Sequence, residues 1–366
     1  MPDTTTAAIP AIESKIRVLS IDGGGIRGII PARILQYIEE EIGRITGDKN
    51  ARIGEYADMV AGTSTGGILA CLYLAPVSSG STRARYNAAD ALDLYMKHGN
   101  RIFKKNFWDT FSNFTLWNEK YKADNMQKLL NEYFEDLKLS DLIRPCVISS
   151  YDFSKRRATF FNSSDGRKFN GDIKNFYLKN ITRSTSAAPT YFEPAQIKSL
   201  GGGEFNLIDG GVFVNNPAMC AYSEARNTEF SKDPYMNSGF SLPKPDKPSA
   251  KQMFHLSIGT GSETRKFKFE KLKDAGLVEW LPVIIDIMMS GNSETVDYHL
   301  KKMYDTLDAG DRDDYIRLSP SLSSAKADMD NATPKNLERL HEAGSIFVHD
   351  NVEKLNAIAK KLVLYS

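Results

Sequence analysis

Hydrophobic and polar positions along the chain predict strands and helices in turn. Short apolar runs typical of buried strands cover residues 15–21, 56–61, 145–151, 158–162, 205–208, 253–258 and 315–318. Between them, apolar residues recur at helical spacing over residues 31–44, 68–74, 87–98, 123–134, 172–186 and 217–227, with further helices from residue 276 and a last one over 334–364. Strands that alternate with helices predict an α/β fold with a largely parallel central sheet and helices on both faces.

The pattern also sets the expected domain organisation. Residues 1–14 are polar and rich in Thr and Ala, so we expect a disordered N-terminal tail. No linker convincingly divides the rest, which we expect to form one catalytic domain over residues 15–366. The motifs described below lie in its core, residues 16–225, and its last part, residues 270–366, is helical.

The segment 59–67 carries the most specific chemical signal. A short apolar strand runs into Gly62-Thr63-Ser64-Thr65-Gly66, and an apolar helix follows. A G-x-S-x-G turn between a strand and a helix is the nucleophile-elbow pattern, in which the turn exposes the serine hydroxyl. Small residues at both sides let two backbones pass closely. We therefore predict Ser64 as a nucleophile, with the Thr65 amide at the start of the helix beside it.

A second motif, Asp22-Gly23-Gly24-Gly25-Ile26-Arg27-Gly28, follows the first strand. Glycine backbone without side chains lets amide N–H groups converge on one point, as an oxyanion requires. We therefore expect Gly23, Gly24 and Gly25 to donate to an oxyanion, with Arg27 and Gly28 completing the loop and Arg27 adding a positive charge nearby. Asp22 is expected to fix the loop and to take no part in the chemistry.

A third motif, Asp209-Gly210-Gly211, ends another apolar strand and leaves a carboxylate unobstructed. Ligands collect at strand ends in α/β folds, so Asp209 is the predicted base for Ser64. A free aspartate is a weak base, and burial would raise its basicity. A histidine base is the alternative. His255 lies inside a strand pattern, where a core role is more common, and His299, His341 and His349 lie on helical patterns.

Other interpretations of the glycine motifs are weaker. Residues 23–28 also fit G-x-G-x-x-G, the dinucleotide fingerprint, but the acidic residues that follow, Glu39, Glu40 and Glu41, lie on a predicted helix and do not end a second strand. That interpretation also leaves the serine elbow unexplained. A phosphate-binding P-loop is excluded, because no Gly-Lys-Ser/Thr follows. Asp209-Gly210 on its own would more often be a hairpin turn.

Composition limits the kinds of binding partner and the cellular compartment that we expect for this protein. The net charge of the 366 residues is +1, which argues against nucleic-acid binding and strong attachment to anionic membranes. Cys71, Cys146 and Cys220 are scattered within apolar runs and are expected to be buried free thiols. No signal peptide or apolar run of membrane-spanning length is present. We expect a cytoplasmic protein whose membrane contact, if any, is peripheral.

An aromatic segment at residues 101–121 has two interpretations. Aromatic side chains recur every three or four residues, at Phe103, Phe107, Phe111, Phe114, Trp117 and Tyr121. Such periodicity usually marks a helix face buried in the core. The alternative is a lid or interfacial surface, with Lys104 and Lys105 meeting lipid head groups.

The order of the three motifs resembles the patatin-like phospholipase family, from residue 16 to about 225. The segment 185–192, TSAAPTYF, also matches a patatin block, and residues 336–364 resemble the patatin C-terminal region. The resemblance implies a patatin-like three-layer sandwich and a Ser-Asp dyad, Ser64 and Asp209. It also implies a glycine-rich oxyanion loop at Gly23, Gly24 and Gly25, followed by Arg27 and Gly28.

The resemblance implies hydrolysis of fatty-acyl esters of phospholipids or galactolipids, with no metal and no cofactor. A non-catalytic lipid-binding or storage member of the same fold is the alternative. Intact Ser64, Asp209 and glycine loop argue against it, because binding alone needs no such set.

Overall fold

The computed structural model describes residues 14–102, 123–168, 171–236, 243–262 and 267–366. The predicted tail, apart from Ser14, and the aromatic side chains of residues 103–121 lie outside these residues, so the predictions about them stay predictions.

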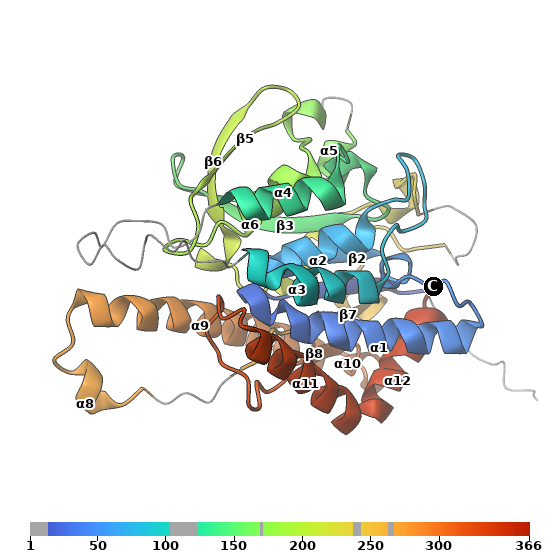
Figure 1. Cartoon of the computed structure of the whole chain (residues 1–366). Coiled ribbons are helices and arrows are strands. Elements are labelled where there is room, and N and C mark those ends of the chain that lie inside the picture. Colours follow the sequence, from blue (N-terminus) through green and yellow to red (C-terminus); the bar gives the residue numbers. More distant parts are fainter. Residues whose placement is uncertain (1–13, 103–122, 169–170, 237–242, 263–266) are drawn as a thin grey trace, which may run out of the picture.

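A single mixed sheet organises the chain (Figure 1). Its strands lie in the order β5-β6-β3-β2-β1-β7-β8, and β4 pairs with β3. The run β3-β2-β1-β7-β8 is parallel, whereas β4, β5 and β6 pair antiparallel. This confirms the largely parallel α/β sheet. The strands are β1 Ile16–Ile21, β2 Met59–Thr63, β3 Cys146–Asp152, β4 Arg157–Asn162, β5 Ala195–Lys198, β6 Glu204–Asp209, β7 Met253–Ile258 and β8 Tyr315–Leu318.

Helices cover both faces of the sheet, because each central strand buries side chains on both sides. In β1, Leu19 and Ile21 join the larger core, whereas Ile16 and Val18 join a smaller core on the opposite face. Helices α1, α2, α3, α4, α6, α11 and α12 contribute to the larger core, and α7 packs on the opposite face beside the second half of α9. The helices are α1 Ile29–Thr46, α2 Thr65–Leu74, α3 Ala88–Ile102, α4 Ala123–Phe134, α5 Ser163–Gly166, α6 Leu178–Thr185, α7 Ala218–Ala225, α8 Phe269–Leu272, α9 Leu277–Asp305, α10 Ala309–Arg312, α11 Pro334–Asp350 and α12 Val352–Leu364.

Three element predictions were wrong in detail. The helix expected over 172–186 starts only at Leu178, because the backbone around Tyr177 pairs with that around Lys138. The helix expected over 334–364 is two helices that meet at Asn351. The φ of −126° and ψ of 23° at Asn351 depart from α-helical values and interrupt the helix. Strand β5 was missed, since only its antiparallel pairing with β6 makes it a strand.

The sheet register brings the predicted site together. Ser64 directly follows Thr63, the last residue of β2, and Thr63 pairs with Ser149 of β3. Asp209, the last residue of β6, pairs with the neighbouring Ser150 on the other side of β3. Strands β2 and β6 therefore end at the same level of the sheet, although β6 arrives there antiparallel to β3.

Candidate active site

Ser64 lies at a sharp turn between β2 and α2. Its φ of 54° and ψ of −122° are rare for a residue with a side chain and carry local backbone strain. Its amide N–H donates to Thr185 Oγ1 at 2.9 Å, and Thr185 Oγ1 donates in turn to the Ser149 carbonyl at 2.7 Å. The turn is thus held by a side chain 121 positions away in the chain.

The two glycines of the elbow are required by close backbone contacts. A Cβ atom on Gly62 would lie 2.2 Å from the Gly66 carbonyl oxygen, and one on Gly66 would lie 2.1 Å from the Ile21 carbonyl oxygen. Neither backbone group can give way cheaply, so a side chain at Gly62 would push β2 from α2, and one at Gly66 would push β1 from α2. The expectation that small residues let two backbones pass is confirmed at both positions.

Asp209 faces Ser64 directly. The Ser64 hydroxyl donates a 2.6 Å hydrogen bond to Asp209 Oδ2, and the Gly211 amide donates to Asp209 Oδ1 at 2.7 Å. Gly210 permits this turn, because a Cβ there would meet Ser149 Oγ at 2.2 Å. Both side chains are buried, and burial raises the pKa of Asp209 to about 7. The carboxylate is therefore a stronger base than an exposed aspartate.

The glycine loop differs from the expected set of donors. The Gly23 amide is not free, because it donates to the Asn215 carbonyl at 3.0 Å. Among the described residues the amides of Gly24, Gly25 and Thr65 make no hydrogen bond, and Gly25 and Thr65 line the same cavity as Ser64. Gly25 and Thr65 therefore bring unpaired amides to the described cavity lining, whereas the Gly23 amide, predicted as a donor, is already paired.

Arg27 and Gly28 support the loop in other ways than expected. The Arg27 guanidinium donates to the Gly24 and Gly261 carbonyl oxygens, and it lines a polar cavity together with Asp22 and Arg317. It therefore supports the loop, and it is not among the described residues that line the Ser64 cavity. A Cβ on Gly28 would lie 2.2 Å from Thr65 Oγ1, so Gly28 lets the loop pack against the elbow.

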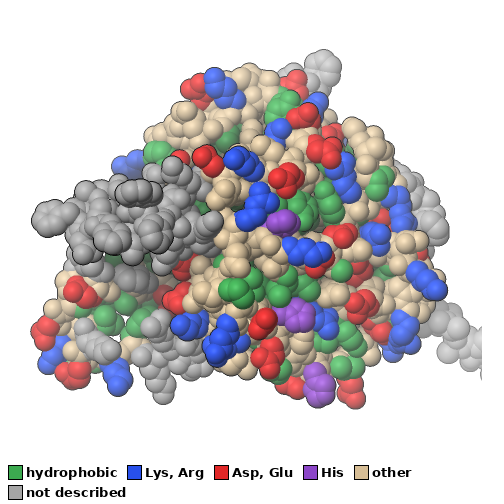
Figure 2. Space-filling model, viewed as in Figure 1, with side chains coloured by type: hydrophobic (Ala, Val, Ile, Leu, Met, Phe, Trp, Pro, Cys, Tyr) green, Lys and Arg blue, Asp and Glu red, His purple; other side chains and the backbone are tan. Residues whose placement is uncertain are grey.

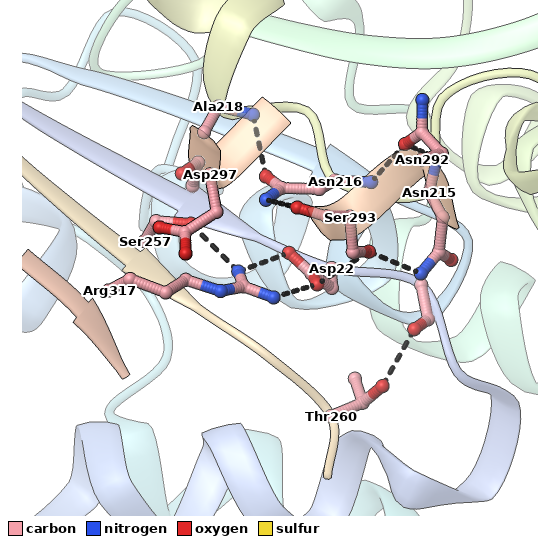
Figure 3. A network of polar contacts seen from close by, with 12 residues as sticks. Asp22, Asn215, Asn216, Ala218, Ser257, Thr260, Asn292, Ser293, Asp297 and Arg317 are labelled. Atoms are coloured by element: carbon pink, nitrogen blue, oxygen red, sulfur yellow. Dashed lines mark hydrogen bonds and ion pairs between the residues drawn. The ribbon is translucent and has the colours of Figure 1, made fainter. Parts of the chain in front are cut away.

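Asp22 fixes the glycine loop, as expected, through a buried network (Figure 3). Its carboxylate forms a two-point ion pair with Arg317 of β8 and accepts from Ser293 of α9 at 3.3 Å. Thr260, two residues after the end of β7, donates to the Gly23 carbonyl at 2.7 Å. Strand β8, helix α9 and the segment after β7, all distant in sequence, thus hold the glycine loop in place.

Helix α9 contributes two residues that the sequence analysis did not single out. Asn292 Oδ1 accepts from the amides of Asn215 and Asn216, and its Nδ2 donates to the Phe213 carbonyl at 3.0 Å. Ser293 Oγ accepts from Asn215 Nδ2 at 3.1 Å while it donates to Asp22 (Figure 3). These two residues join the loop after Asp209 to the glycine loop.

An apolar cavity opens at Ser64. Asp209, Thr65 and Ser186 are polar residues of its wall, and the rest of the described lining is mainly aliphatic, aromatic or methionine side chains from several elements: Ile68, Tyr95, Ile102, Met126, Ala188, Pro189, Tyr191, Phe192, Val212, Ile285, Met288, Met289 and Met329. A cavity of this composition fits a hydrocarbon chain whose reacting end lies at Ser64.

The histidines do not reach this cavity. His255 is fully buried in β7, its Nε2 lies 3.2 Å from Ser20 Oγ, and burial lowers its pKa to about 3. It packs edge-on against Tyr315, as the core interpretation expected. None of the five histidines belongs to the described lining around Ser64.

The described residues contain neither a cluster of metal-binding side chains nor a helix that could cross a membrane. Within the described ranges, no three His, Cys, Asp or Glu side chains are grouped so that they could hold a metal ion. No helix in the part of the chain that the structure describes is long and apolar enough to cross a membrane. Cys71 and Cys146 are buried free thiols as expected, and Cys220 is half-buried.

Comparison with known proteins identifies the family. The model of the family described as "Patatin-like phospholipase" matches residues 19–222, which include all three motifs. Patatin-like protein 2 of Arabidopsis thaliana is 34% identical over 95% of this chain and 86% of its own length. Patatin-T5 of Solanum tuberosum is 31% identical over 96% of this chain and 89% of its own length. The chain belongs to the patatin-like phospholipase family.

Family membership supports lipid acyl hydrolysis as the general activity. Among solved structures, VipD from Legionella pneumophila aligns over 92% of this chain and 67% of that chain, with a TM-score of 0.36 and 12% sequence identity, which is a distant likeness.

Helix α9, with Asn292 and Ser293, lies outside the segment matched by the family model. The patatin block at residues 185–192 surrounds the site: Thr185 holds the elbow, and the Ala187 carbonyl accepts from the Asp209 amide.

Proposed function

We propose that this protein is a serine lipid acyl hydrolase in which Ser64 and Asp209 form a catalytic dyad that works without a metal. The observation that carries the proposal is the 2.6 Å hydrogen bond from the Ser64 hydroxyl to a buried carboxylate at the end of an apolar cavity. The substrates would be fatty-acyl esters of phospholipids or glycolipids, with the acyl chain in the cavity.

The geometry supports a two-step acyl transfer. Asp209 accepts the hydroxyl proton as Ser64 Oγ attacks the ester carbonyl carbon. The unpaired amides of Gly25 and Thr65 in the cavity lining, with that of Gly24, would donate to the negative oxygen. The tetrahedral intermediate collapses to an acyl-enzyme, and Asp209 returns the proton to the departing alcohol. Asp209 then takes a proton from water as the water attacks the acyl-enzyme, and it returns this proton to Ser64 Oγ when the second tetrahedral intermediate collapses and the fatty acid is released.

The products test the proposal directly. Purified protein incubated with a mixed lipid extract should release free fatty acids and the matching lysolipids, measured by mass spectrometry. If lipids bind but no ester is cleaved, the non-catalytic alternative holds instead.

The dyad predicts a specific pH dependence. Asp209 must be deprotonated to act as a base, and its pKa is raised to about 7, so kcat/KM should fall tenfold for each pH unit below about 7. An ordinary exposed aspartate would keep full activity down to about pH 5. A kcat/KM that is flat from pH 5 to 8, on a soluble ester and with the fold intact, would contradict this role.

The glycine loop should act on the transition state. A methyl group on Gly24 would meet Thr260 Oγ1 at 2.2 Å, so Gly24→Ala displaces the loop and its donor. We expect kcat to fall by about 10²–10³, the scale seen when an oxyanion donor is lost. KM should change far less, because the ground-state carbonyl makes little use of these donors. A variant that raises KM alone would place Gly24 in substrate binding.

A further inference from the structure

The first half of α9 carries an apolar face that belongs to none of the hydrophobic cores formed by the described residues. Leu281, Ile284, Ile287 and Met288 are 45, 41, 50 and 47% exposed. Leu281, Ile284 and Ile287 lie three residues apart and Met288 lies four after Ile284, so all four share one side of the helix. We call these four residues the α9 apolar face. In Figure 1 this half of the helix projects from the body beside α8, whereas its second half packs against α7.

The α9 apolar face is continuous with the wall of the cavity at Ser64. Ile285, Met288 and Met289 line that cavity, so Met288 belongs to the cavity wall and to the exposed face at once. A hydrocarbon chain entering the cavity would therefore pass the same helix turn that presents apolar side chains to the outside. This continuity indicates what covers the face: the lipid surface from which the chain comes.

The face is also fixed relative to the reacting groups. Asn292 and Ser293, one turn after Met288, bond to the loop that follows Asp209 and to Asp22 (Figure 3). A surface that docks on the first half of α9 would therefore lie at a set distance from Ser64.

Charge around the face points to electrically neutral lipid. The first half of α9, residues 277–290, contains two carboxylates and no Lys or Arg, whereas the preceding residues 263–276 contain five basic and three acidic residues, so the whole stretch has a net charge of 5 − 5 = 0. Acidic and basic side chains are interspersed over the surface in Figure 2, where neither sign dominates a broad area. Anionic membranes attract clusters of Lys and Arg, and the half of α9 that carries the apolar face has neither residue type. Apolar burial would supply the affinity.

We infer that the α9 apolar face docks this protein on the surface of uncharged or zwitterionic lipid, with the mouth of the Ser64 cavity turned toward it. The inference rests on the proposed function, because it takes the lipid as the source of the substrate.

Vesicle binding tests the inference without relying on turnover. The probe is a vesicle of diether phosphatidylcholine, which has no ester to cleave, and bound protein is measured by flotation. Wild-type protein should bind equally at low and high salt. The double variant Ile284→Glu/Ile287→Glu should bind roughly 100-fold more weakly, since two side chains of this size lose their apolar burial. Neither residue belongs to the described cavity lining, so hydrolysis of a short soluble ester should stay within about twofold of wild type.

A matched control uses two isoleucines exposed elsewhere, Ile173 and Ile346, which are 64 and 41% exposed. The variant Ile173→Glu/Ile346→Glu should float like the wild type. Equal vesicle binding by wild type and the α9 variant would overturn the inference, as would absence of wild-type binding or binding that needs anionic lipid and disappears in high salt. A wild-type dimer in lipid-free solution that the α9 variant dissociates would assign the face to a second copy. Failure of wild-type protein to hydrolyse the soluble ester would count against the proposed function and not against the docking face.

Discussion

Replacing Ser64 by alanine should lower ester hydrolysis by roughly 10⁴–10⁶-fold, the range found when a serine nucleophile is removed. No other hydroxyl in the described part of the chain donates to Asp209, so no acyl-enzyme can form by another route through this carboxylate. Folding should be unaffected, because alanine accepts the same backbone geometry as serine and removes one buried oxygen. Initial rates on a soluble ester and the midpoint of thermal unfolding check both parts.

Ser186 provides the matched control for this variant. It lines the same cavity, but its hydroxyl donates to the Thr182 carbonyl and does not bond to Asp209. Ser186→Ala should keep activity within about tenfold of wild type. Near-normal turnover by Ser64→Ala, or an equal loss in both variants, would remove Ser64 from the role of nucleophile.

Replacing Asp209 by asparagine should lower kcat by about 10³–10⁴-fold, as observed when the acidic member of a serine catalytic set is neutralised. Asparagine keeps the volume of the side chain and can accept a hydrogen bond from the Gly211 amide, but it cannot take the proton of Ser64.

The raised pKa of Asp209 also predicts an effect of this variant on stability. In the wild type the folded state holds the Asp209 proton up to about pH 7, whereas the unfolded chain releases it near pH 4, so this group costs stability increasingly as pH rises between these values. Asp209→Asn should therefore be at least as stable as wild type at pH 8.

His255→Gln separates a dyad from a triad. His255 lies in the core against Ser20 and Tyr315, so this change should lower the unfolding temperature and leave kcat of the folded protein nearly unchanged. If kcat falls as far as in Asp209→Asn while the protein stays folded, the base is a histidine and the assignment of Asp209 is wrong.

The elbow and the Asp209 turn could be predicted from sequence because their chemistry is local. Gly62 and Gly66 sit within a few residues of Ser64, and their need for close backbone contact is visible as a short motif. Apolar runs likewise predicted the central strands. The contact between Ser64 and Asp209 could not be derived from the local motifs alone, because it follows from the register of β2 and β6 on the two sides of β3.

The donors of the glycine loop could not be separated by sequence alone. The sequence gives no chemical difference between Gly23, Gly24 and Gly25. Only the folded structure shows that the Gly23 amide is already paired, with the Asn215 carbonyl. Arg27 was expected near the serine because of its place in the motif, but its guanidinium donates to the Gly24 and Gly261 carbonyl oxygens. Asn292 and Ser293 gave no signal either, because polar residues on a long helix usually face solvent.

Covalent labelling tests the central claim most directly. A long-chain alkyl phosphonate, which mimics the ester and traps an activated serine, should form one adduct on Ser64, located by mass spectrometry of peptides. Asp209→Asn should be labelled far more slowly, because its serine is no longer activated. An adduct on a different residue, or no adduct under conditions in which the protein hydrolyses lipid, would contradict the Ser64–Asp209 dyad.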